Sequence, residues 1–282
     1  MENPVLLTRV IEALRPVRGL AAIVLGGSRG RGTAGPASDY DIGLYYEPDA
    51  PIDVAMLQSA IAPLVDEPSS TVTRMGEWGP WINGGGWLTI AGVKVDLLYR
   101  DLGRVREVIA EARQGRFSMN YQVGHPHGFC SAIWMGEVAT CQPLLDPLGR
   151  IAELKGETWP YPRALRDALI ARFGWEVGFA IENAELAARR AEQTHIAGCA
   201  YRALCCVAQV LFALNGRYLI NEKGAVAEAA TYPITLAGLA QEQAEIWRDI
   251  GNADHERALR RLRSLSDGLR ALVEHYFSPS AP

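Results

Sequence analysis

Apolar and polar residues follow two different periods in the first half of the chain. Apolar side chains recur at helical spacing in some segments, whereas others are short apolar runs bounded by glycine, proline or aspartate, as buried strands are. Predicted helices cover residues 5–14, 54–65, 102–114 and 133–140. Predicted strands cover residues 20–25, 42–46, 71–74, 87–90 and 93–99. This mixture favours an α/β (α+β) fold, with a hairpin across Ala91-Gly92.

The pattern changes near residue 146, where strand signals become scarce. Residues 197–214 are apolar almost throughout, which predicts the central helix of a bundle. Residues 175–193 and 246–276 would supply further helices around it. We interpret Gln142–Pro147 as a hinge. The expected organisation is therefore an α/β domain over residues 1–145 and an all-α domain over residues 146–282.

A glycine-rich turn follows the first predicted strand. It begins with Gly26, Gly27 and Ser28, and Arg29 and Arg31 come next. Glycine allows positive φ and a close approach of the backbone to a ligand. Successive backbone N–H groups in such a turn can bind phosphate oxygens. The two arginines could add positive charge there or lie free in solvent.

Two carboxylates stand two residues apart at the start of the next predicted strand. Residues at this spacing share one strand face, so Asp39 and Asp41 would point the same way. Asp96 lies in another predicted strand and is a third candidate. Neighbouring like charges are unfavourable unless something neutralises them. Carboxylate oxygens suit Mg²⁺ that also contacts a substrate phosphate.

These residues resemble the signature of the DNA polymerase β-like nucleotidyltransferase superfamily. That signature is a Gly-Ser turn, a loop, Asp-x-Asp on a strand and a third carboxylate on a neighbouring strand. Gly27-Ser28, Asp39-x-Asp41 and Asp96 match it. The resemblance implies an N-terminal catalytic domain with a mixed sheet, followed by a helical bundle that binds substrate or nucleotide.

The same resemblance implies the roles of the site residues. Asp39, Asp41 and Asp96 would be the catalytic residues and would bind two Mg²⁺ ions. Asp96 would complete the second metal site or act as the general base. Gly27 and Ser28 would hold the phosphates of a nucleoside triphosphate, for which ATP is the expected choice.

The second half resembles the helical domain of aminoglycoside and lincosamide nucleotidyltransferases. Residues 211–215 and 221–224 carry this resemblance. In that branch a lysine after the central helix reaches back to the triphosphate, and Lys223 matches it. We therefore expect a metal-dependent enzyme that transfers AMP from ATP to a hydroxyl of a small molecule, of which an antibiotic is one version. This would place the triphosphate between the two expected domains.

Two other functions stay open. One is a protein-adenylylating enzyme of a toxin–antitoxin type system, but such members are usually single small domains. The other is a non-catalytic nucleotide-binding module, against which the three carboxylates argue because without a metal they would only repel one another.

Composition limits the partners and the location. The net charge of −4 does not favour nucleic-acid binding. It suits a small or cationic acceptor, which Glu176, Glu182 and Glu185 could bind. The five cysteines form no C-x-x-C pair and are expected to be reduced thiols. We see no signal segment and no apolar run of membrane-spanning length, so we expect a cytoplasmic protein without membrane contact. The acceptor and the oligomeric state are not encoded in any motif.

Two more segments carry candidate chemistry. Trp78, Trp81 and Trp87 lie within ten residues and form either a packed loop or an aromatic wall for a base or an acceptor ring. His125 and His127 have no third metal ligand nearby at a family spacing, so we expect them to pack at a helix start. The arginines of the last predicted helix are expected to be solvated: Arg257, Arg260, Arg261 and Arg263.

Overall fold

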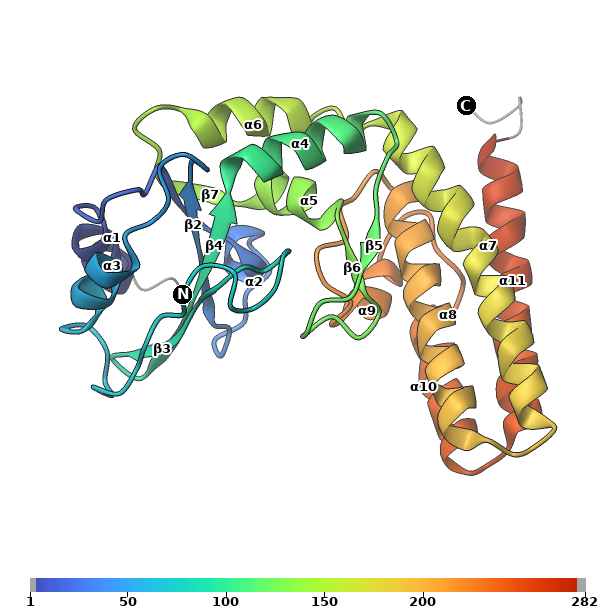
Figure 1. Ribbon diagram of the computed structural model, residues 1–282. Coiled ribbons are helices and arrows are strands. Elements are labelled where there is room, and N and C mark those ends of the chain that lie inside the picture. The colour runs from blue at the N-terminus through green and yellow to red at the C-terminus, as the bar shows by residue number, and fades with distance from the viewer. Residues whose placement is uncertain (1–3, 278–282) are drawn as a thin grey trace. The chain divides into compact units, whose positions relative to one another are not determined.

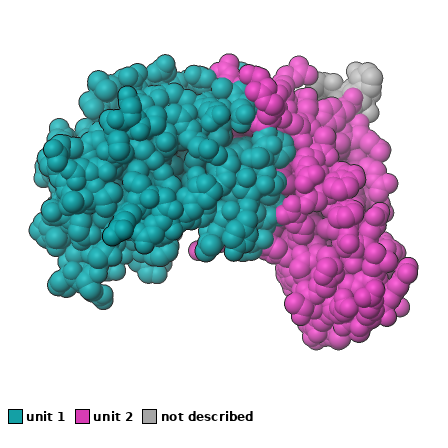
Figure 2. All heavy atoms as spheres, in the orientation of Figure 1, with its two compact units in different colours: residues 1–111, 117–160 teal, residues 112–116, 161–282 magenta. Residues whose placement is uncertain are grey.

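The computed structural model describes residues 4–277, which fall into two compact units (Figures 1 and 2). The first unit comprises residues up to 111 and residues 117–160. The second comprises residues 112–116 and those from 161 onward. The expected mixed α/β fold followed by a helical part is confirmed. The expected domain boundary at residue 145 stays a prediction.

The first unit is built on a five-stranded sheet of order β3-β4-β2-β1-β7 (Figure 1). Strands β2 and β4 are parallel, and the other neighbours are antiparallel, so the sheet is mixed as expected. Helix α4 ends in residues assigned to the second unit. The elements are α1 (Pro4–Leu14), β1 (Ala22–Leu25), α2 (Gly27–Gly30), β2 (Tyr40–Tyr46), α3 (Val54–Ile61), β3 (Gly85–Ile90), β4 (Val93–Asp101), α4 (Leu102–Arg113), β5 (Met119–Asn120), β6 (Phe129–Cys130), α5 (Ile133–Thr140), β7 (Gln142–Leu145) and α6 (Arg150–Thr158).

The main core of the first unit lies between one face of this sheet and helices α1 and α3. Strand β2 contributes Tyr40, Ile42 and Leu44, which are at most 2% exposed. Removing such side chains from water is the dominant favourable term in folding. Because side chains alternate along a strand, Asp41 and the residues in phase with it must lie on the opposite face.

The second unit is helical, and residues 161–277 contain no strand. Helices α7 and α8 run side by side, and α11 packs against both (Figure 1). Asn215 ends α8 with side-chain hydrogen bonds to the carbonyl oxygens of Leu211 and Ile234. The elements are α7 (Arg163–Ala188), α8 (Gln193–Leu214), α9 (Ala225–Ala229), α10 (Leu239–Gly251) and α11 (His255–Phe277).

Helix α8 is apolar enough to correct one expectation. By length and composition alone it could cross a membrane, although the sequence suggested that no run reached such a length. However, 72% of its most apolar window is buried inside the structure. A central helix of a bundle has the same property, because it is apolar on every side that its neighbours cover.

Four segments differ from the sequence-based expectations. Residues 142–145 form the edge strand β7 and are not a hinge; an edge position tolerates the proline there. Residues 71–74 are not a strand, although Thr73 donates one backbone hydrogen bond to β3. Residues 246–276 are divided between α10 and α11. His125 and His127 lie in the turns between β5 and β6 and not at a helix start.

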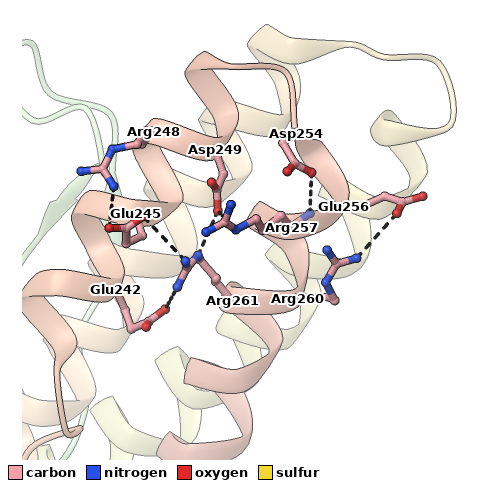
Figure 3. Close-up of polar contacts among 9 residues, drawn as sticks. All are labelled: Glu242, Glu245, Arg248, Asp249, Asp254, Glu256, Arg257, Arg260 and Arg261. Atoms are coloured by element: carbon pink, nitrogen blue, oxygen red, sulfur yellow. Dashed lines mark hydrogen bonds and ion pairs between the residues drawn. The ribbon is translucent and has the colours of Figure 1, made fainter.

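The arginines of α11 are paired with acidic groups, contrary to the expectation that they are merely solvated (Figure 3). Arg261 donates to Asp249 Oδ2 at 2.9 Å and to Glu242 Oε2 at 2.8 Å. Arg257 lies 3.5 Å from the same Asp249 oxygen. Asp249 is only 3% exposed, so its charge depends on these partners.

We predict that Arg261→Ala lowers the melting temperature of the protein more than Arg260→Ala does. The first change leaves the buried Asp249 carboxylate with only the longer contact to Arg257. Within residues 4–277, Arg260 pairs with the exposed Glu256, and exposed pairs contribute little. Thermal unfolding followed by circular dichroism measures both variants. Equal melting temperatures would show that the α10–α11 ion pairs do not stabilise the unit.

Candidate active site

Asp41 and Asp96 are brought together by the pairing of two parallel strands. They are partners in the register of β2 and β4, and neighbouring strands lie about 4.8 Å apart. Both therefore project from the face opposite α1 and α3. Asp39 comes one residue before β2, whereas the sequence suggested a position within the strand.

The three carboxylates affect one another electrostatically. The pKa of Asp41 is raised from 3.8 to about 6, chiefly by burial and then by the charges of Asp96, Glu137 and Asp39. The pKa of Asp96 is also raised, first by burial and then by Asp39, while Lys94 opposes the shift. The structure thus places the negative charges close enough to destabilise each other.

The glycine turn packs directly against Asp41. The Gly26 N–H donates to the Asp41 carbonyl oxygen at 2.8 Å. Gly27 has φ of +56°, and a Cβ built on it would lie 1.7 Å from Asp41 Oδ2. Only a residue without a side chain fits there. Ser28 is half-buried and follows Gly27 in the short helix α2, so two of the expected phosphate-binding residues lie in the segment that packs against Asp41.

Arg29 has a supporting position that the sequence did not indicate. It is 7% exposed, and its guanidinium donates to the carbonyl oxygens of Ser38 and Asp39 at 2.6–3.2 Å. It also lies over the Tyr40 ring at 3.9 Å from the ring centre. The guanidinium therefore fixes the backbone that carries Asp39 and is not free in solvent.

An ion pair between the buried Arg100 and the half-buried Glu137 was also missed by sequence analysis. Arg100 is 3% exposed and makes two hydrogen bonds of 2.8 Å to Glu137 of α5. Arg100 lies four residues after Asp96, so alternation along β4 does put it on the carboxylate face. Glu137 gives no comparable signal, because only packing brings α5 to this face. The two members of the pair have opposite effects on Asp41: Glu137 raises its pKa and Arg100 lowers it.

The side chains fit Mg²⁺ in donor type. Asp39, Asp41 and Asp96 offer hard oxygen ligands, which Mg²⁺ prefers. The bare Cα of Gly27 lets an Asp41 oxygen approach the backbone closely. Over residues 4–277, no three His, Cys, Asp or Glu side chains are grouped so as to hold a metal ion already. Metal binding by the three aspartates therefore stays a prediction.

The second unit holds the other residues expected to bind ligands. Lys223 is exposed in the turn before α9, where its N–H donates to Asn221 Oδ1 at 2.8 Å. Its role toward a triphosphate stays a prediction. Glu176 and Glu185, expected to attract a cationic acceptor, are paired with Arg202 and Arg263. Their charges are thus already compensated.

Part of the chain resembles a known protein family. Residues 7–115 match the family model described as "Nucleotidyltransferase domain", and most of the matched residues belong to the first unit. No curated protein matches the chain. A solved structure of a nucleotidyltransferase-like protein from Exiguobacterium sibiricum 255-15 is similar, with 11% identity and a TM-score of 0.42 over 94% of this chain and 74% of that one.

We predict that Asp41→Asn stabilises the metal-free protein at alkaline pH. The pKa of Asp41 is raised on folding, so its ionised form destabilises the folded state. The folded protein begins to lose stability as pH rises above 3.8, and this loss is complete above about 6. At pH 8 the variant should gain on the order of 2–3 kcal/mol in unfolding free energy, at about 1.4 kcal/mol per pKa unit.

Urea unfolding with EDTA at pH 4, 6 and 8 measures this effect. Little gain is expected at pH 4, where a protonated aspartate resembles asparagine. Asp49→Asn, at an exposed turn, is the control and should change stability by less than about 0.5 kcal/mol. A gain over the wild type that is no larger at pH 8 than at pH 4 would contradict the raised pKa of Asp41.

A second prediction concerns Gly27→Ala, with Gly32→Ala as its matched control. Both glycines have positive φ, +56° and +72°, so each alanine should cost about 1–2 kcal/mol in backbone strain. Only at position 27 would the new methyl group collide with Asp41; nothing lies within 4 Å of it at position 32. We expect Gly27→Ala to abolish ATP binding and Gly32→Ala to retain it, as measured by calorimetry. Equal affinities would place the nucleotide elsewhere.

Proposed function

We propose that this chain transfers a nucleoside monophosphate from a nucleoside triphosphate, ATP being the expected donor, to a hydroxyl of a small molecule. The observation that carries this proposal is the pairing of Asp41 with Asp96, beside the Gly27 turn, inside a nucleotidyltransferase domain. An antibiotic is one candidate acceptor, as in the branch that the second half resembles.

The proposed reaction is an in-line displacement at the α-phosphorus. The acceptor oxygen forms a bond to that phosphorus, and the bond from the phosphorus to the bridging oxygen breaks. Pyrophosphate leaves with the electron pair, and the hydroxyl proton passes to Asp96 or to water. This chemistry needs positioning and charge stabilisation more than covalent participation by the protein.

Each site residue has a part in this proposal. Asp39, Asp41 and Asp96 would hold two Mg²⁺ ions, which when bound supply positive charge at the attacking and leaving oxygens. Gly27 and Ser28 would hold the β- and γ-phosphates with backbone N–H groups. Arg29 would keep Asp39 in place through its bonds to the backbone.

Lys223 would add a further cation to the phosphates. It is exposed, so its ammonium group is accessible to a ligand. A lysine is a common phosphate-binding side chain and acts as a point charge.

The proposal predicts pyrophosphate release that needs both a divalent cation and an acceptor. Each nucleoside triphosphate would be incubated with aminoglycosides, lincosamides and other hydroxylated compounds, with Mg²⁺ or with EDTA. Asp41→Asn should lower turnover by orders of magnitude because a shared metal ligand is lost. Lys223→Ala should weaken ATP binding without changing the melting temperature of the free protein.

Asp49→Asn is the control for these assays and should behave as the wild type. Near-normal turnover of Asp41→Asn, or equal turnover in EDTA, would overturn the proposed role of the carboxylates. Unchanged ATP affinity in Lys223→Ala would reject the role of that lysine alone.

A further inference from the structure

A continuous row of residues crosses the sheet at the level of the carboxylates. Trp87 of the edge strand β3 pairs with Asp96 of β4, and Asp96 pairs with Asp41 of β2. The backbone carbonyl oxygen of Asp41 in turn accepts a hydrogen bond from the N–H of Gly26, just after β1. Directly opposed residues of paired strands project from the same face. Trp87 therefore stands beside Asp96, at the end of the row away from the glycine turn.

Trp87 is unusually exposed for its size. It is 70% exposed, and its ring stacks on Trp78 at 4.4 Å between ring centres with 18° between the planes. By contrast, Trp81 from the same segment is 8% exposed and packs against Phe129 and Trp134. The packed-loop interpretation thus holds for Trp81 and not for Trp87. Exposed apolar surface next to polar groups is typical of a binding site.

The stacked pair is held in place by the structure beneath it. Gln122, which is 4% exposed, donates to the Trp78 carbonyl oxygen at 2.8 Å and accepts from the Ile82 N–H at 3.3 Å. Gly85 leaves space for the Trp78 ring, because a Cβ there would lie 3.0 Å from it. A rigid aromatic surface binds a ligand with little loss of conformational entropy.

The in-line geometry of the reaction, which rests on the proposed function, indicates which ligand reaches this surface. In an in-line displacement the acceptor and the leaving pyrophosphate lie on opposite sides of the α-phosphorus. The glycine turn at one end of the row would hold the β- and γ-phosphates. The acceptor must then approach from the other end, where Trp87 lies beside Asp96.

We propose that Trp87, supported by Trp78, stacks on the ring that carries the acceptor hydroxyl. The acceptor is therefore a small molecule with a flat ring face, either an aromatic ring or a sugar ring, and not an open-chain alcohol. Trp87 selects the acceptor and does not bind the nucleotide. Stacking also brings the hydroxyl to Asp96, the carboxylate nearest to the tryptophan.

Binding of three hydroxylated probes to the full chain without nucleotide tests this proposal. The probes are 4-nitrophenyl β-D-glucopyranoside, methyl β-D-glucopyranoside and sorbitol, with affinities measured by ligand-observed NMR. We expect at least one ring-bearing probe to bind more tightly than sorbitol. Trp87→Ala should weaken that binding about 5- to 100-fold, the range for loss of a stacking partner, and Trp87→Phe should retain most of it.

Trp175→Ala is the matched control. Trp175 is also exposed (59%) and stacked, here on Phe179 at 5.0 Å, but it belongs to α7 of the second unit. This variant should bind the probes as the wild type does. Preference for the nitrophenyl compound would identify an aromatic acceptor, and equal affinity for the two glucosides would identify a sugar. Sorbitol binding as tight as that of the glucosides, or equal losses in Trp87→Ala and Trp175→Ala, would overturn the proposal.

The outcome is separable from that of the proposed function, since probe binding requires no transfer. If pyrophosphate release is found, Trp87→Ala should raise KM for the acceptor and leave KM for the nucleotide unchanged. The opposite pattern would make Trp87 a nucleotide contact and would reject the proposal while leaving the transfer activity established.

Discussion

Repulsion between neighbouring carboxylates is the constraint around which the first unit is arranged. Asp41 and Asp96 occupy adjacent positions of paired strands, and Asp39 lies close enough to influence both. Such a cluster opposes folding in the absence of a cation. It is maintained because the apolar residues that alternate with it on β2 and β4 are buried beneath α1 and α3. The burial on one face of the sheet thus holds together charges that would otherwise separate on the other.

Two buried arginines support this face in different ways. Arg29 bonds to the backbone before β2 and therefore positions Asp39 without contacting its carboxylate. Arg100 is satisfied by Glu137 and so connects the sheet to α5. The charge of Arg100 is paired with the Glu137 carboxylate, although it still lowers the pKa of Asp41. Arg29 bonds only to neutral carbonyl oxygens, so its positive charge stays beside the segment that carries Asp39.

The row of Gly26, Asp41, Asp96 and Trp87 gives the site a direction. A backbone turn suited to phosphate stands at one end, and an exposed aromatic surface stands at the other. Edge strands commonly need protection from pairing with other chains. Here the edge strand β3 instead presents a large aromatic side chain. The proposed transfer reaction requires two ligands on opposite sides of one phosphorus atom, and a linear arrangement of this kind can hold both.

The sequence by itself determined the features that depend on near neighbours along the chain. The strand and helix periods, the Gly27-Ser28 pair and the two-residue spacing of Asp39 and Asp41 are all local features of a few residues. The helical second half could be predicted for the same reason, because the apolar run in α8 is local. Asp96 was identified only because its family signature accompanies the other two aspartates.

Tertiary structure alone decided the relations between distant segments. The sequence contains no signal for the register that pairs Trp87 with Asp96 and Asp96 with Asp41, since a slip of one residue would reverse every side chain. The partners of Arg29 and Arg100 were hidden for the same reason, as was the pairing of residues 142–145 with β1, where a proline suggested a hinge. These contacts form because a common core must be filled and most buried polar groups must find partners. Only the folded chain can meet both requirements at once.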